Sequence, residues 1–113
     1  MADATDQIIV FVTASSEEEA VTIGRKLVEG ELVACANVIP RIRSVFRWEG
    51  KVAEEQEALL ILKSRMELFD QLEKAVKSLH SYSVPEIIAV PLAKGAGNYL
   101  DWISEMTGKP KKN

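Results

Sequence analysis

The stretch that decides the fold is ACANVIPRIRSVFRWEGKVAEEQEALLILK, residues 34–63. Its first half is extended in character, and Arg41 to Trp48 place alternate residues on two faces: Ile42, Ser44, Phe46 and Trp48 on one, Arg41, Arg43, Val45 and Arg47 on the other. This period of two is typical of a β-strand. Because proline has no N–H to donate to a ladder, Pro40 predicts an edge position or a bulge.

Glu49-Gly50 predicts a two-residue hairpin loop that leads into a second strand over residues 51–63. With this loop, Arg43 and Arg47 lie on the same face as Glu54 and can pair with it across the strands. Residues 58–62 are apolar on both faces, which indicates a covered central strand.

Upstream, the β-branched run of residues 8–13 predicts another central strand. A helix over residues 16–29 follows. Capping-box spacing is met by Ser15 with Glu18 or by Ser16 with Glu19, and Gly30 suits the position after the helix.

Downstream, Ser64 and Glu67 have capping-box spacing ahead of a second helix over residues 65–80. Residues 87–90 predict a short strand. After a loop at residues 94–97, Asn98 is expected to cap a last helix over residues 99–107.

The predicted fold class is therefore α+β, a ferredoxin-like β-α-β-β-α-β sandwich with a long hairpin and a C-terminal helix. The length of 113 residues fits a single domain, 1–113, with a core at 8–107 and flexible ends at 1–7 and 108–113.

The hairpin also predicts an oligomer. Ala34–Trp48 spans roughly 50 Å when extended, whereas a domain of ~100 residues is only about 34 Å across. Either the hairpin bends back at Pro40, or Phe46 and Trp48 are covered by identical subunits. We expect the second, because burying such an aromatic contributes roughly 2–3 kcal/mol.

Composition limits the function classes. The net charge of −3 gives no cationic surface for nucleic acid, so we expect no nucleic-acid partner. The basic end, residues 109–113, is interpreted as a solvated terminus. No apolar run approaches the ~20 residues that span a bilayer, and no signal-peptide pattern is visible, so we expect no membrane partner. A single cysteine, Cys35, excludes an intrachain disulfide and favours the cytoplasm.

An enzyme is not expected. The only histidine, His80, has no nucleophile-elbow motif beside it, and the glycine-rich residues 94–97 lack phosphate-loop spacing.

Several separated motifs resemble the CutA divalent-cation-tolerance family. They are LVACANVIP at 32–40, WEGK at 48–51, LILKS at 60–64, HSYSVPEI at 80–87, and the pair Tyr99 and Trp102. The resemblance implies a ferredoxin-like homotrimer built through the long hairpins, a link to tolerance of divalent cations, above all copper, and a likeness to the trimeric PII signalling proteins.

The resemblance also implies metal contacts at a first-strand cysteine and at a histidine pair. Val12 and Leu79-His80 occupy these positions here, so only His80 matches. We therefore predict His80 as a metal ligand, with Cu(II) or another divalent cation bound weakly rather than as a tight cofactor. The alternative for His80 is a cationic helix cap. Cys35 is a candidate thiol, or a small buried strand residue.

A second hypothesis is a cleft between subunits that binds a small anionic effector. Its candidate residues are Trp48, Glu57, Lys63, Tyr82 and Glu86. The alternatives are that Glu57 and Lys63 are charges on the sheet surface, that Trp48 anchors an interface, and that Tyr82 and Glu86 fix the turn at Pro85.

Overall fold

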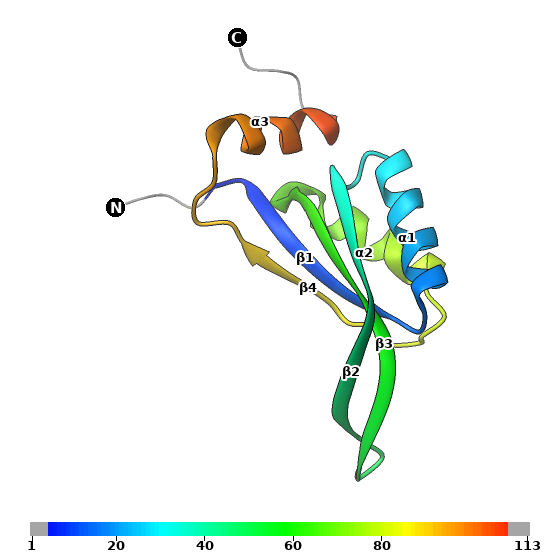
Figure 1. Cartoon of the computed structure of the whole chain (residues 1–113). Coiled ribbons are helices and arrows are strands. Elements are labelled where there is room, and N and C mark those ends of the chain that lie inside the picture. The colour runs from blue at the N-terminus through cyan, green and yellow to red at the C-terminus, as the bar shows by residue number, and fades with distance from the viewer. Residues whose placement is uncertain (1–4, 109–113) are drawn as a thin grey trace.

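The hairpin of residues 34–63 is the most prominent feature of the chain (Figure 1). In the computed structural model, which describes residues 5–108, strands β2 (Cys35–Trp48) and β3 (Lys51–Arg65) pair antiparallel, with Trp48 opposite Lys51. Glu49 and Gly50 have φ angles of 50° and 78°. Two left-handed residues make a type I′ turn, so the predicted loop is confirmed. The register shifts between Ile39 and Ile42, which confirms the bulge at Pro40.

Two further strands complete one antiparallel sheet in the order β2-β3-β1-β4. Strand β1 (Gln7–Ala14) lies between β3 and β4 (Ile87–Pro91), and is central as predicted. The chain order β-α-β-β-α-β, followed by a helix, is the predicted α+β arrangement.

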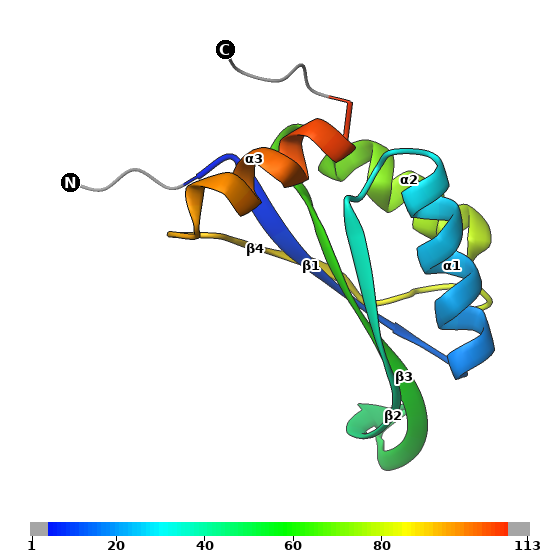
Figure 2. The ribbon, with the colours of Figure 1, turned by 45° about the horizontal axis from the view of Figure 1, so that its top comes forward.

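Helices α1 (Glu17–Glu29) and α2 (Phe69–Leu79) cover one face of the sheet (Figure 2). The core between these layers includes Val10, Leu60 and Leu72, each fully buried. α1 approaches the sheet closely at Gly24, where an added Cβ would lie 2.9 Å from the Cβ of Ala36. A glycine is therefore required for this packing distance.

Two local predictions at helix ends are wrong. Ser64 does not cap a helix, because β3 continues to Arg65 and the Ser64 hydroxyl is buried, donating to the Leu32 carbonyl at 2.6 Å. A 3-10 turn (Met66–Leu68) then precedes α2. Asn98 does not cap helix α3 (Gly97–Met106), which begins after Ala96 without a side-chain cap. Gly30 directly follows α1, as predicted, and the left-handed residue is the next one, Glu31 (φ 59°).

The opposite face of the sheet is not covered by a helix (Figure 1). By strand alternation it carries Ile39, Ile88 and Val90, which are 40%, 53% and 47% exposed. The α3 helix instead lies across one end of the sheet (Figure 2).

The hairpin also extends well beyond the body of the subunit. We call residues 42–57, the part beyond the bulge, the arm. The subunit measures 53 × 33 × 22 Å, and Trp48 and Val52 on the arm are 61% and 68% exposed. The interpretation in which the hairpin folds back onto its own subunit is therefore wrong. Of the ends expected to be flexible, residues 1–4 and 109–113 lie outside the described residues.

Candidate functional site

His80 ends helix α2 and points into the subunit, where its side chain is fully buried. Its Nε2 lies 2.7 Å from the Thr13 carbonyl oxygen, and its Nδ1 lies 3.0 Å from the Tyr82 N–H nitrogen. A carbonyl only accepts and an N–H only donates, so Nε2 carries the proton and Nδ1 is the acceptor. These contacts hold a neutral imidazole, and not the cationic cap considered for this residue.

Glu19 lies beside this imidazole, with its carboxylate 3.9 Å from His80 Nδ1. The same carboxylate accepts hydrogen bonds from the Ser15 N–H and hydroxyl at 2.9 and 2.8 Å and from the Ser81 N–H at 2.8 Å. Partial burial raises the pKa of Glu19, but these hydrogen bonds outweigh it and lower the pKa to about 2. Glu19 is therefore a stable anion that joins the start of α1 to the turn after α2.

Tyr82 connects His80 to Glu57, another residue of the predicted cleft. Its hydroxyl donates to Glu57 at 2.8 Å, and its ring lies 4.7 Å from the His80 ring. Burial, the Glu57 hydrogen bond and neighbouring carboxylates raise the pKa of Tyr82 above its usual range. The hydroxyl thus remains a donor at neutral pH. Glu57, Tyr82 and His80 form one hydrogen-bonded chain, and the Glu19 carboxylate lies beside it, 3.9 Å from His80 Nδ1.

The other predicted cleft residues lie elsewhere in the subunit. Lys63 contacts the Asn37 amide oxygen, and Cys35 Sγ lies 3.7 Å from that oxygen. Cys35 is half-buried and pairs with Lys63 across β2 and β3. Trp48 is at the end of the arm, and Glu86 is exposed just before β4. One chain therefore brings Glu57 and Tyr82 into contact, whereas Trp48 and Lys63 lie at other positions along the hairpin and, within residues 5–108, Glu86 forms no hydrogen bond with either member of the pair.

A closed metal site is not formed within residues 5–108. In this range no group of three or more histidine, cysteine, aspartate or glutamate side chains is arranged to hold a metal ion. Metal binding through His80 Nδ1 would require Tyr82 N–H to release that nitrogen. The residues of one described subunit therefore do not fit a tightly bound structural metal.

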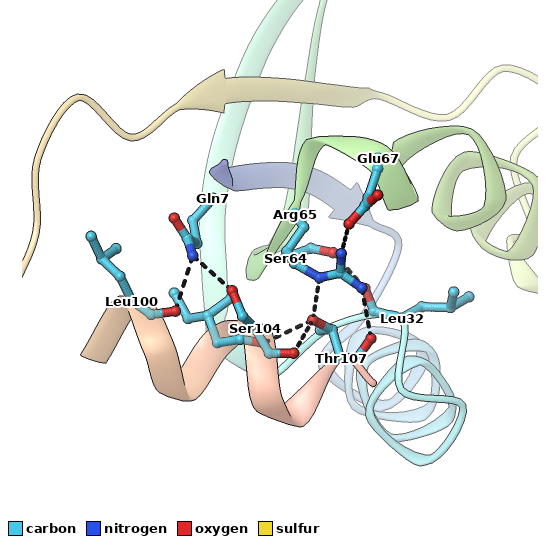
Figure 3. Close-up of polar contacts among 9 residues, drawn as sticks. Gln7, Leu32, Ser64, Arg65, Glu67, Leu100, Ser104 and Thr107 are labelled. Atoms are coloured by element: carbon cyan, nitrogen blue, oxygen red, sulfur yellow. Dashed lines mark hydrogen bonds and ion pairs between the residues drawn. The ribbon is translucent and has the colours of Figure 1, made fainter. Parts of the chain in front are cut away.

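Sequence reasoning missed the buried polar residues that attach α3 (Figure 3). Gln7 Nε2 donates to the Leu100 carbonyl at 3.0 Å and to the Ser104 hydroxyl at 2.8 Å. Arg65 donates from Nε to the Thr107 hydroxyl at 2.8 Å and from Nη2 to its carbonyl at 2.9 Å, and it pairs with Glu67. The available signal was a polar residue at the end of each of two apolar strands: Gln7 begins β1 and Arg65 ends β3, and the two are paired across the strands.

Also missed was a cleft of about 420 Å³ next to Glu57, at the base of the arm. The β1–α1 turn, the bulge and β3 line it, so three segments far apart in the sequence meet there. From the sequence, Pro40 was interpreted only as an edge position or a bulge. Ser15 and Ser16 were interpreted only as candidate caps of the helix that follows them.

Comparison with known proteins identifies the family. A family model described as "CutA1 divalent ion tolerance protein" matches residues 8–106. This chain belongs to that family.

CutA proteins of bacteria and of eukaryotes are similar to this chain. The chain is 49% identical over 100 residues to the divalent-cation tolerance protein CutA of Thermus thermophilus, covering 88% of this chain and 97% of that protein. Against human protein CutA it is 41% identical over 97 residues, which are 86% of this chain but 54% of that protein. The chain thus spans about half the length of several eukaryotic relatives.

Solved structures agree with the architecture. The CutA1 structure from Oryza sativa has a TM-score of 0.90 at 39% identity, with 95% of this chain and 98% of that chain covered. The Archaeoglobus fulgidus protein, described as periplasmic, has a TM-score of 0.87 at 40% identity, with coverage of 89% and 98%. Within residues 5–108, no helix has the length and apolar character needed to cross a membrane.

Proposed function

We propose that this chain is a non-enzymatic homotrimer that contributes to divalent-cation tolerance, with copper as its main metal and with weak metal binding. The CutA1 family match over residues 8–106 carries this proposal. We place the protein in the cytoplasm on the basis of its single free thiol, Cys35.

Two uncovered surfaces support assembly. The open sheet face presents Ile39, Ile88 and Val90, and the arm presents Trp48 and Val52. An arm that reaches onto the next subunit makes a contact between two different patches, and such head-to-tail contacts form a closed ring when the rotation between copies closes, as a threefold rotation does. Three copies would shield aromatic and aliphatic side chains that a lone subunit leaves in water.

The metal proposal centres on His80. Its imidazole is neutral, as a ligand must be, and the Glu19 carboxylate lies 3.9 Å from Nδ1. Since Nδ1 already accepts the Tyr82 N–H, an entering Cu(II) must displace that bond. Weak rather than tight binding follows, because the local hydrogen bonding opposes coordination.

Titration of Cu(II) against wild type, His80→Ala and Cys35→Ser tests this assignment. We expect His80→Ala to weaken binding by about tenfold or more, and Cys35→Ser to bind as wild type does. Circular dichroism verifies that each variant is folded. Equal, millimolar binding in all three would remove His80 from the site, and light scattering with and without copper reports assembly separately.

A second candidate function is a PII-like scaffold that binds a small anionic effector or a protein partner. The cleft at the base of the arm favours it, because Arg41 lines this cleft beside the Glu57–Tyr82 pair. In a thermal-shift screen, a nucleotide or small carboxylate that binds the native state must raise the melting temperature. If none does, this candidate fails.

A further inference from the structure

The cleft at the base of the arm combines charges of both signs. Its polar lining comprises Ser15, Ser16, Glu17, Arg41, Gln56 and Glu57. The volume of about 420 Å³ lies within the range typical of small-molecule sites. The bulge in β2 positions Arg41, and bulges commonly redirect a side chain next to a site.

One part of the cleft suits a carboxylate. Within residues 5–108 no carboxylate forms an ion pair with Arg41, so its guanidinium donors are available. The Ser16 oxygen accepts the Glu19 N–H at 3.1 Å, which leaves its O–H free to donate. The Gln56 amide adds donors of its own.

Another part suits an ammonium group. Glu57 is buried, and in the described part of the chain only the Tyr82 hydroxyl hydrogen-bonds to its carboxylate, through Oε2. An ionised carboxylate only accepts, so Oε1 can take a further donor. The Ser15 hydroxyl donates to Glu19 and therefore presents lone pairs. Glu17 contributes a second carboxylate to the lining.

We infer that this cleft binds a small zwitterion of the amino-carboxylate class, with its carboxylate on Arg41 and its ammonium on Glu57. Glu17 and Glu57 would repel a simple anion, and Arg41 would repel a simple cation. One molecule that carries both charges therefore complements the lining best. The inference refines the second candidate function and does not depend on metal binding.

Calorimetric titration of the metal-free full chain tests the assignment. The probes are glycine, γ-aminobutyrate and ε-aminocaproate, which separate the same two charges by increasing distances. Butyrate and butylamine each lack one charge and serve as matched ligands. We expect one amino acid to bind about tenfold more tightly than either matched ligand, since each matched ligand loses one set of hydrogen bonds to a charged group.

Variants assign each charge. Arg41→Gln should remove the preference for γ-aminobutyrate over butylamine, and Glu57→Gln, which preserves a partner for Tyr82, should remove the preference over butyrate. Arg25→Gln and Glu29→Gln change the same charges at exposed positions of α1, outside the cleft and the arm, and should bind as wild type does.

Three results would overturn the inference: no advantage for any amino acid, equal losses in Arg41→Gln and Arg25→Gln, or equal losses in Glu57→Gln and Glu29→Gln. The thermal-shift screen separates the two proposals. If nucleotides or carboxylates stabilise the protein while amino acids do not, the effector function stands and the zwitterion fails.

Discussion

The Glu19 side chain makes a long-range contact that its local sequence pattern does not predict. The spacing of Ser16 and Glu19 predicted a capping box, and Ser16 does accept the Glu19 N–H. The Glu19 carboxylate, however, also binds the Ser81 N–H, from a turn 62 residues away. It therefore fixes the segment that holds His80 and Tyr82, and the cap is part of the candidate site.

This network predicts a pH dependence of stability. The folded pKa of Glu19 is about 2, below its ordinary 4.5, so its contribution is complete above about pH 4.5 and is lost as pH falls toward 2. Glu19→Gln should lower the free energy of unfolding at pH 7 by about 1–2 kcal/mol. It should also flatten the decline in stability between pH 4.5 and 2.

Urea denaturation at a series of pH values measures both effects. Glu18→Gln removes a neighbouring exposed carboxylate from the same turn and is the matched control. It should retain the wild-type decline. An identical pH profile for Glu19→Gln and wild type would contradict the role given to Glu19.

At the scale of elements, the turn of the hairpin is set by backbone conformation. Gly50 has a φ of 78°, where a side chain is strained even though an added Cβ would contact nothing within 4 Å. Gly50→Ala should therefore destabilise the hairpin by about 1 kcal/mol.

Gly97 begins α3 and also has open space around it, without a positive φ. Gly97→Ala should be neutral or stabilising by up to about 1 kcal/mol, and thermal unfolding of the two variants compares them. A similar change in both would rule out strain at the turn.

The same elements show which parts of the fold are predictable. Strand alternation, the Glu49-Gly50 turn and the bulge at Pro40 are local, and the sequence predicted all three correctly. The caps assigned to Ser64 and Asn98 were wrong, because tertiary contacts decided them: Ser64 is buried by the Leu32 loop, and α3 is attached through Gln7 and Arg65.

The candidate site was predictable to a similar extent. Glu57 and Tyr82 were in the predicted set and do meet. Their connection to Glu19 depends on the packing of α1 against the α2–β4 turn, which no local spacing reports. Arg41 was recognised only as part of an alternating strand, because the cleft exists only after β1, β2 and β3 are assembled.

At the scale of the whole molecule, the shape of the subunit argues for association. A radius of gyration of 15.1 Å exceeds the ~13 Å expected for ~100 residues, and the arm extends away from the rest of the fold (Figure 1). The arm carries Val45, Trp48 and Val52, each more than 60% exposed. An isolated two-stranded ribbon is only marginally stable in water, so a partner surface would stabilise it.

The proposed trimer therefore predicts that Trp48 is a principal contact. Trp48→Ser should weaken association by at least about 2 kcal/mol per subunit, as expected for a buried aromatic anchor. Sedimentation velocity at micromolar concentration should show trimers for wild type and smaller species for the variant. Val21→Ser removes an apolar side chain from the helix-covered side and should leave the trimer intact. In a Trp102→Phe background, Trp48 is the sole indole, so its fluorescence reports burial directly. If wild type sediments as a monomer and quencher reaches Trp48 freely, the arm is not an interface and the trimer must be abandoned.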